Sequence, residues 1–285
     1  MPLSKPSERT KRLPPWLRVK LPDNKEFAET GRLLASRGLH TVCQSARCPN
    51  IFECFSRKVA TFMILGAVCT RNCAFCNITP GAPTPVDPDE PRRLAEAARE
   101  LGLRHVVVTS VTRDDLPDGG AAHFAATIRA LKQNTDVSVE VLIPDLGGSE
   151  CDLSTILDAR PDVLNHNVET VPRLYPAIRP QADYQQSLTL LSRAAAAGVP
   201  AKSGLMVGLG ETDGEVNAVI RDLAAAGCSM VTVGQYLAPS RLHPEPDRYV
   251  PPPHFDEYAA CGRHHGIRHM FCGPHVRSSY KAEKI

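Results

Sequence analysis

Apolar and polar positions along this chain follow two periods, one typical of buried strands and one typical of amphipathic helices. Short apolar runs, rich in β-branched residues, are each followed by a longer segment with apolar positions three and four residues apart. The short runs predict strands over residues 61–66, 105–110, 137–143, 163–168, 201–207 and 230–235. The longer segments predict helices over residues 91–101, 121–132, 153–158, 184–197, 213–226 and 255–264.

This alternation predicts an α/β fold with a parallel sheet. Successive parallel strands are joined by right-handed crossovers, which place the helices outside the sheet. Six β/α units are fewer than a closed TIM barrel contains, so we expect a partial (β/α)6 barrel of the TIM type over residues 59–272. Residues 1–58 then form an N-terminal extension with a helix over 25–37, and residues 273–285 form a C-terminal tail that closes on it.

Three cysteines follow the first predicted strand with the spacing C-x3-C-x2-C. They are Cys69, Cys73 and Cys76, called the rim triad below. Active residues of such barrels sit at the C-terminal ends of strands, and soft thiolates suit iron–sulfur clusters, zinc and copper. Structural zinc normally takes four protein ligands, and no fourth ligand follows nearby. The spacing therefore favours a 4Fe–4S cluster with one open iron over the alternatives, a structural zinc site or unligated thiols.

A second set of cysteines lies in the extension. Cys43, Cys48 and Cys54, called the extension triad, have the spacing C-x4-C-x5-C, which fits no common zinc finger. Six of the ten cysteines lie between positions 43 and 76, and no signal peptide is recognisable. Such clustering argues for metal binding rather than disulfides. A second cluster could relay electrons or supply sulfur, and the residues alone leave both roles open.

Composition narrows the classes of partner. Lys and Arg number 33 and Asp and Glu number 31, and the resulting net charge of +2 gives no case for nucleic-acid binding. No apolar run approaches the roughly 20 residues that span a bilayer, so we expect a cytoplasmic protein with no membrane partner. The basic, proline-rich first twenty residues are interpreted as a solvated arm.

The rim triad, with Phe75 before its last cysteine, resembles the cluster loop of the radical S-adenosylmethionine (SAM) enzymes. In that superfamily the open iron chelates the amino and carboxylate groups of SAM. One electron then cleaves the sulfonium and gives a 5′-deoxyadenosyl radical, so no catalytic side chain beyond the cluster ligands is predicted. On this resemblance, Asn167 and Glu169 would bond the ribose hydroxyls of SAM, and Lys202 would pair with its carboxylate.

Nearly the whole chain resembles the lipoyl synthase family. The motifs that carry this resemblance are both triads and the stretches 15–22, 41–51, 109–111, 113–120, 165–175, 202–211, 234–237 and Arg277-Ser-Ser-Tyr280. The chain departs from the family pattern at Phe52, at Ala67 or Val68, at Thr112 and at Lys281, and none of these departures removes a cluster ligand.

The resemblance implies that two sulfur atoms are inserted at C6 and C8 of an octanoyl chain on a lysine of a carrier protein. It implies a 4Fe–4S cluster on the rim triad that binds SAM. It also implies an auxiliary 4Fe–4S cluster on the extension triad, with Ser279 as fourth ligand, that donates the sulfur. The implied partners are octanoylated lipoyl domains of 2-oxoacid dehydrogenase E2 subunits, the glycine cleavage H protein, an electron donor such as ferredoxin or flavodoxin, and a carrier that rebuilds the auxiliary cluster.

Other functions stay open at this point. A radical SAM methylthiotransferase acting on tRNA or protein also has two clusters, although its extra cysteines are spread over a larger N-terminal domain. A non-catalytic iron–sulfur electron carrier would use both triads without SAM. Free octanoate as the substrate is a third possibility, but a barrel mouth that admits a lysyl arm fits a carrier protein better.

Overall fold

The computed structural model describes residues 13–18, 25–45, 48, 50–56 and 61–279, with the backbone alone for 25–30, 55 and 56. The interpretation of residues 1–12 as a solvated arm, and the departure at Lys281, lie outside the described residues. No helix within the described ranges is long and apolar enough to cross a lipid bilayer.

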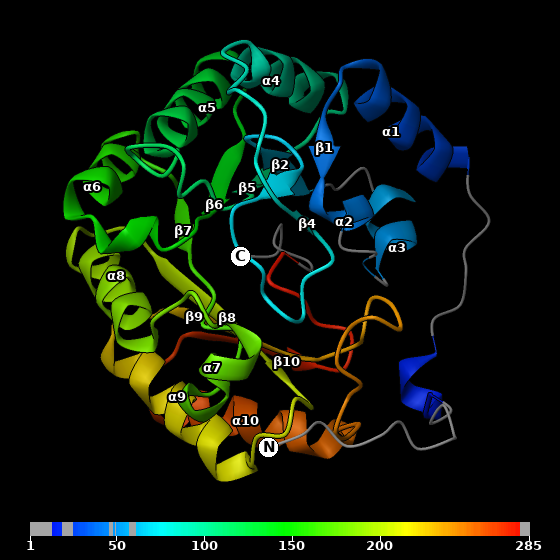
Figure 1. Ribbon diagram of the computed structural model, residues 1–285, viewed down its shortest axis with the longest axis vertical. Coiled ribbons are helices and arrows are strands. Elements are labelled where there is room, and N and C mark those ends of the chain that lie inside the picture. Colours follow the sequence, from blue (N-terminus) through cyan, green and yellow to red (C-terminus); the bar gives the residue numbers. More distant parts are fainter. Residues whose placement is uncertain (1–12, 19–24, 46–47, 49, 57–60, 280–285) are drawn as a thin grey trace.

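The centre of the molecule is one sheet that curves into an open barrel (Figure 1). Its strands lie side by side in chain order, and each pairs in parallel with the next, except that β1 runs antiparallel to β2. No pairing between β2 and β10 is found within the described chain, so the barrel stays open. The strands are β1 (His40–Thr41), β2 (Thr61–Ile64), β5 (His105–Ser110), β6 (Ser138–Leu142), β7 (Val163–Asn165), β8 (Ala201–Val207), β9 (Met230–Gln235) and β10 (His269–Gly273).

Six helices form a ring outside the parallel strands, as the sequence pattern predicts (Figure 1). Each helix turns its apolar side toward the sheet, where side chains such as Phe62 of β2 and Ile128 of α5 are fully buried. The predicted partial (β/α)6 barrel is therefore confirmed, and β10 adds a parallel strand that the sequence analysis did not predict. The helices are α4 (Glu90–Glu100), α5 (Ala121–Asn134), α6 (Glu150–Asp158), α8 (Tyr184–Ala196), α9 (Asp213–Ala225) and α10 (Pro252–His264).

The N-terminal extension lies beside β1, on the side where the barrel is open (Figure 1). Arg37 follows its longest helix and forms an ion pair at 2.9 Å with Glu96 of α4, which holds the extension against the barrel. The helices of this part are η1 (Pro15–Leu17), α1 (Lys25–Ser36), α2 (Val42–Ser45) and α3 (Ile51–Ser56).

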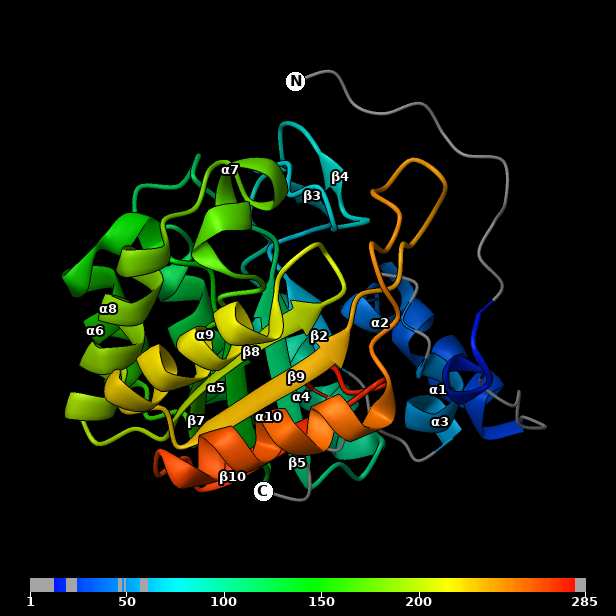
Figure 2. The ribbon, with the colours of Figure 1, turned by 90° about the horizontal axis from the view of Figure 1, so that it is seen from below.

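Shorter elements gather at the C-terminal edge of the sheet. Figure 2 shows β3, β4 and α7 at the same edge as the gold-to-orange loop that follows β9. This edge carries the rim triad, because Cys69 ends β3, and the loop from Cys69 to Cys76 connects β3 to β4. The elements are β3 (Val68–Cys69), β4 (Thr79–Pro80), η2 (Leu146–Gly148), η3 (Pro172–Leu174) and α7 (Tyr175–Ile178).

Candidate active site

A cavity of about 670 Å³ opens at the C-terminal ends of the strands. It brings together residues from the extension, from the barrel and from the tail, which are far apart in the sequence. All ten cysteines lie in the described part of the chain and are free thiols. The predicted site residues that line the cavity are Cys43, Cys48, Cys54, Cys69, Cys73, Cys76, Asn167, Glu169 and Ser279.

The rim triad is held by backbone hydrogen bonds from neighbouring loops. The Thr70 N–H donates to the Thr112 carbonyl at 3.1 Å, and the Ala74 N–H donates to the Ile178 carbonyl at 2.9 Å. Two further N–H groups, of Arg71 and Thr112, point at the sulfur of Cys69 at 3.4 and 3.3 Å. N–H groups aimed at a ligand sulfur are a means by which a protein tunes an iron–sulfur cluster.

Arg71, inside the rim triad loop, fastens this loop to the ends of two strands. Its guanidinium donates to both carboxylate oxygens of Asp145 at 2.7 Å each. It also donates to both oxygens of Asp114 at 2.9 and 2.8 Å. The Asp145 side chain is only 1% exposed, whereas that of Asp114 is 44% exposed, so the Asp145 pair is the buried anchor. A bidentate pair of this kind fixes orientation as well as distance.

The extension triad is built by two short helices and the turn between them. The Cys48 N–H donates to the Cys43 carbonyl at 3.1 Å, and the Cys54 N–H donates to the Asn50 carbonyl at 3.0 Å. The Asn50 side chain then donates to the backbone carbonyl of His275 at 2.7 Å. This contact ties the extension triad to the tail that carries Ser279.

Burial raises the pKa values of two thiols in each triad. Burial raises the pKa of Cys43 to about 11 and that of Cys76 to about 12. It also raises the pKa values of Cys48 and Cys73. Metal binding therefore has to displace protons from these sulfurs. No group of three or more His, Cys, Asp or Glu side chains in the described chain is arranged to hold a single metal ion. The thiols of the two triads are soft donors of the kind that hold iron–sulfur clusters.

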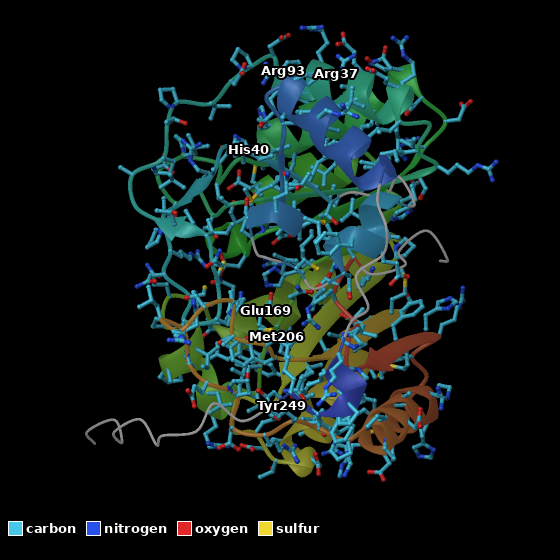
Figure 3. All side chains as sticks on the ribbon, turned by 90° about the vertical axis from the view of Figure 1, so that its right-hand side faces the viewer. Arg37, His40, Arg93, Glu169, Met206 and Tyr249 are labelled. Carbon is cyan, nitrogen blue, oxygen red and sulfur yellow. The ribbon has the colours of Figure 1, made fainter. Side chains whose placement is uncertain are left out.

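Asn167 and Glu169 face the cavity after the end of β7, as predicted. Glu169 lies beside Met206, which also lines the cavity (Figure 3). The backbone of Glu169 has a left-handed φ of 65°. Burial raises the pKa of Glu169. The Asn167 Oδ1 atom is buried without a hydrogen-bond partner in the described structure. An unpaired acceptor in a cavity suits a ligand hydroxyl.

Lys202 does not belong to this cavity in the structure. Among the described residues, those lining the cavity do not include Lys202, which is the second residue of β8. Its ammonium lies 2.9 Å from each carboxylate oxygen of Glu140, and both side chains are buried. Burial by itself raises the pKa of Glu140, but the charge and hydrogen bonds of Lys202 and His105 outweigh this effect and lower it. This buried ion pair leaves the predicted contact with a SAM carboxylate without support.

Arg179, which the sequence analysis missed, is a cation that lines the cavity, and Arg277 of the tail is another. It donates to the backbone carbonyls of Asn167 and Val168 at 3.0 and 3.1 Å. Its Nε atom is buried and has no hydrogen-bond partner in the described structure. A signal was present in the sequence, since Arg179 comes soon after the end of the fourth predicted strand, where ligand-binding residues of such barrels gather.

Comparison with solved structures supports the fold. The chain aligns with methylornithine synthase over 89% of its own length and 82% of that chain, with a TM-score of 0.50 and 14% identity. It aligns with Streptococcus suis SuiB bound to S-adenosylmethionine over 81% of its length and 52% of that chain, with a TM-score of 0.55 and 10% identity. At these identities the likeness concerns the barrel alone.

Comparison of sequences identifies the family. The profile of the radical SAM superfamily matches residues 63–223, and that of the N-terminal domain of lipoyl synthase matches residues 2–48. Lipoyl synthase of Oleidesulfovibrio alaskensis is 64% identical over 95% of this chain and 94% of its own length. That of Caldanaerobacter subterraneus is 55% identical over 96% of this chain and 97% of its own, and that of Chlorobium limicola is 50% identical over 98% and 96%. The chain therefore belongs to the lipoyl synthase family of radical SAM enzymes.

Proposed function

We propose that this chain inserts two sulfur atoms, at C6 and C8, into an octanoyl chain carried on a lysine of a partner protein. The observation that carries this proposal is the shared cavity, onto which the rim triad, the extension triad and Ser279 all open. Relatives with 50–64% identity over nearly the whole chain support the same reaction. For this reason a methylthiotransferase or a non-catalytic electron carrier is not favoured.

The rim triad would hold the 4Fe–4S cluster that binds SAM, and this cofactor supplies the radical that abstracts hydrogen from unactivated carbon. The residues around it are suited to hold the rest of the SAM molecule. Asn167 and Glu169 offer acceptors for the ribose hydroxyls, and Arg179 offers a cation for the carboxylate. We therefore propose Arg179 in the role that the sequence analysis gave to Lys202.

The extension triad and Ser279 would hold the auxiliary 4Fe–4S cluster. A serine oxygen is a harder and more basic ligand than thiolate, and it leaves readily as the protonated alcohol. A cluster with one such ligand can come apart more easily than one with four thiolates, which suits a sulfur donor. The contact between Asn50 and the His275 carbonyl keeps the tail beside the extension triad.

The cavity is also suited to an extended hydrocarbon chain. Side chains at the ends of β5, β6 and β8 give it an apolar wall, including Val111, Leu142 and Met206. The proposed substrates are octanoylated lipoyl domains of 2-oxoacid dehydrogenase E2 subunits and the glycine cleavage H protein. Ferredoxin or flavodoxin would deliver electrons, a cluster carrier would rebuild the auxiliary cluster, and the cytoplasm is the proposed compartment.

Two variants test this proposal against a matched control. The anaerobic enzyme is incubated with SAM, a reductant and an octanoyl-lysyl peptide, and both 5′-deoxyadenosine and the peptide mass are measured. Cys73→Ala should abolish deoxyadenosine formation because it removes a ligand that has no substitute. Ser279→Ala should keep deoxyadenosine formation but impair sulfur transfer, and it should lower the iron content of the auxiliary site. Cys151→Ala, at an exposed thiol outside the cavity, should behave like wild type.

Unchanged deoxyadenosine formation by Cys73→Ala would show that the rim triad does not bind the SAM cluster. Normal lipoyl product from Ser279→Ala would refute the serine ligand. A SAM-dependent product other than the dithiolated octanoyl chain would favour a different radical SAM reaction.

A further inference from the structure

Residues 274–279 of the tail lie inside the open barrel, against two glycines of the sheet (Figure 1). A Cβ atom at Gly234 of β9 would lie 2.1 Å from the carbonyl oxygen of Val276. A Cβ atom at Gly204 of β8 would lie 2.3 Å from Thr232 Oγ1 of β9, 3.0 Å from Asn167 Oδ1 and 3.3 Å from the hydroxyl oxygen of Ser278. Close approach of another segment is a common reason for glycine inside a strand. The tail is therefore packed against the inner side of β8 and β9.

Within this packing, Ser278 contacts the Asn167 amide directly. The Asn167 Nδ2 group donates to the Ser278 hydroxyl at 2.6 Å and to the Glu169 carboxylate at 3.0 Å. An amide nitrogen has two hydrogens, and both are used here. Because a carboxylate accepts, the contact with Glu169 also decides which end of the amide is the nitrogen.

This arrangement leaves one atom of Asn167 for a ligand. The Oδ1 atom is buried and has no partner among the described residues. The amide therefore offers an acceptor, and no donor, to a molecule in the cavity. A ribose hydroxyl can donate, so it matches that acceptor and keeps its own lone pairs for other donors.

We propose that Ser278 is a positioning residue for the nucleoside of SAM. The Glu169 carboxylate selects the orientation of the Asn167 amide, and Ser278 holds the amide in the place where Oδ1 is presented to the ribose. This inference rests on the proposed role of Asn167 and Glu169, and it adds a residue from the far end of the chain to the SAM site.

A coupling between the two cluster sites follows from the position of Ser278. The next residue is Ser279, the proposed ligand of the auxiliary cluster. A movement of the tail that withdraws Ser279 also takes Ser278 away from Asn167 and weakens SAM binding. By linkage, bound SAM stabilises the docked tail to the same extent. Such coupling reduces SAM binding, and hence SAM cleavage, when the tail has left the sulfur-donating site.

The test is equilibrium binding of SAM to the anaerobic enzyme with both clusters present and oxidised, so that SAM is not cleaved. Ser278→Ala should weaken SAM binding about threefold to tenfold, the range expected for loss of one net hydrogen bond. Ser278→Thr keeps the hydroxyl and should bind SAM within about twofold of wild type. Gly234→Ala should weaken SAM binding to a similar extent by displacing the tail. Because both substitutions remove the same contact, the Gly234→Ala/Ser278→Ala double variant should bind SAM as tightly as the single variant with the lower affinity.

Free methionine is the specificity probe, because it has the chelating amino and carboxylate groups and no ribose. Its effect on the spectrum of the rim cluster should be the same in wild type and Ser278→Ala. Unchanged SAM affinity in Ser278→Ala would overturn the inference, and so would an equal loss for methionine. If the wild-type enzyme, loaded with both clusters, failed to bind SAM, the proposed function itself would be wrong. Failure of the proposed function can thus be told from failure of the Ser278 inference.

Discussion

Replacement of Arg71 by methionine should loosen the rim triad loop before any cluster binds. The substitution keeps much of the length of the side chain but removes the guanidinium that joins the loop to Asp145 and Asp114. The Asp145 carboxylate would remain buried with its charge uncompensated, and its remaining protein contact would be the Gly147 N–H at 3.2 Å. We therefore expect both the fold and the cluster site to be weakened.

The magnitude follows from burial. Removing one partner of a buried ion pair costs about 3–5 kcal/mol, because an unpaired charge stays in a poorly solvated place. The exposed pair with Asp114 adds at most about 1 kcal/mol. Arg71→Met should therefore lower the free energy of unfolding at pH 7 by about 3–5 kcal/mol, chiefly through Asp145.

The pH dependence provides a second signature. Burial by itself raises the pKa of Asp145, but the hydrogen bonds and charge of Arg71 outweigh it and lower the pKa below its ordinary value of 3.8. The pair therefore stabilises the folded state above pH 3.8, and this stabilisation is lost as the pH falls through the lowered pKa. Without Arg71, burial would raise the pKa of Asp145 above its ordinary value of 3.8, so the variant would take up this proton at a higher pH than wild type. The difference between wild type and Arg71→Met should therefore be largest near neutral pH and should shrink as the pH falls toward the lowered pKa of wild type.

Urea unfolding of the metal-free chain under anaerobic conditions measures the change, and iron content after reconstitution measures cluster loading. Arg37→Met is the matched control, since it removes a guanidinium whose carboxylate partners are more exposed, and its effect should be much smaller. Arg71→Met combined with Asp145→Asn should recover part of the lost stability, because no unpaired charge remains. If Arg71→Met unfolded at the same urea concentration as wild type and took up the same iron, the reasoning would be wrong.

Two further substitutions test contacts away from the cavity. Lys202→Met should lower the free energy of unfolding by about 3–5 kcal/mol, because it leaves the buried Glu140 carboxylate without its ammonium partner. Urea unfolding measures this loss of stability, and the SAM affinity of the variant should stay unchanged. A large loss of SAM affinity would support the original prediction that Lys202 contacts SAM. Thr212→Ala should cost about 1 kcal/mol because it removes the capping box that begins α9. Thr212→Ser keeps the cap and should unfold at the same urea concentration as wild type. Equal unfolding midpoints for Thr212→Ala and Thr212→Ser would contradict the capping argument.

The barrel could be predicted from the sequence because its signal is local. Buried parallel strands are apolar runs, and helices that cover them have a regular apolar side. The predicted strands at 105–110, 201–207 and 230–235 have the bounds seen in the structure. The first predicted strand is shorter than expected, since Leu65 and Gly66 have left-handed φ values of 66° and 93°. Such backbone angles end a strand but leave little trace in a pattern of hydrophobicity.

Strand β10 was not predicted, because its sequence lacks the apolar, β-branched pattern of the other strands. Its five residues, His269–Gly273, include no β-branched side chain, and their side chains are only partly buried. Strand preference is largely a matter of fit to neighbours, and here the neighbour is β9, which pairs with β10 along its whole length. The sequence of β10 carries no comparable signal of its own.

Residues that line the cavity could be predicted where the sequence spacing of the residues itself indicates a site. Contacts between residues far apart in the sequence could not be predicted in this way. The cysteine triplets and Asn167 could be found because their residue types follow strands at short range. The assignment of Lys202 did not foresee Glu140, which lies 62 positions away in the sequence and accepts two hydrogen bonds from the ammonium. The role of Gly234 was equally hidden, because only the folded structure brings Val276 against it.

A half-buried arginine lies near each triad and favours the thiolate form of its cysteines. Burial raises the pKa values of Cys48 and Cys73, which disfavours the thiolate form that binds iron. The charge of Arg277 opposes this shift at Cys48, and the charge of Arg179 opposes it at Cys73. Neither arginine belongs to the segment that carries its triad. Docking of the tail and of the segment after β7 therefore favours thiolate formation, so closure of the fold and loading of the clusters support one another.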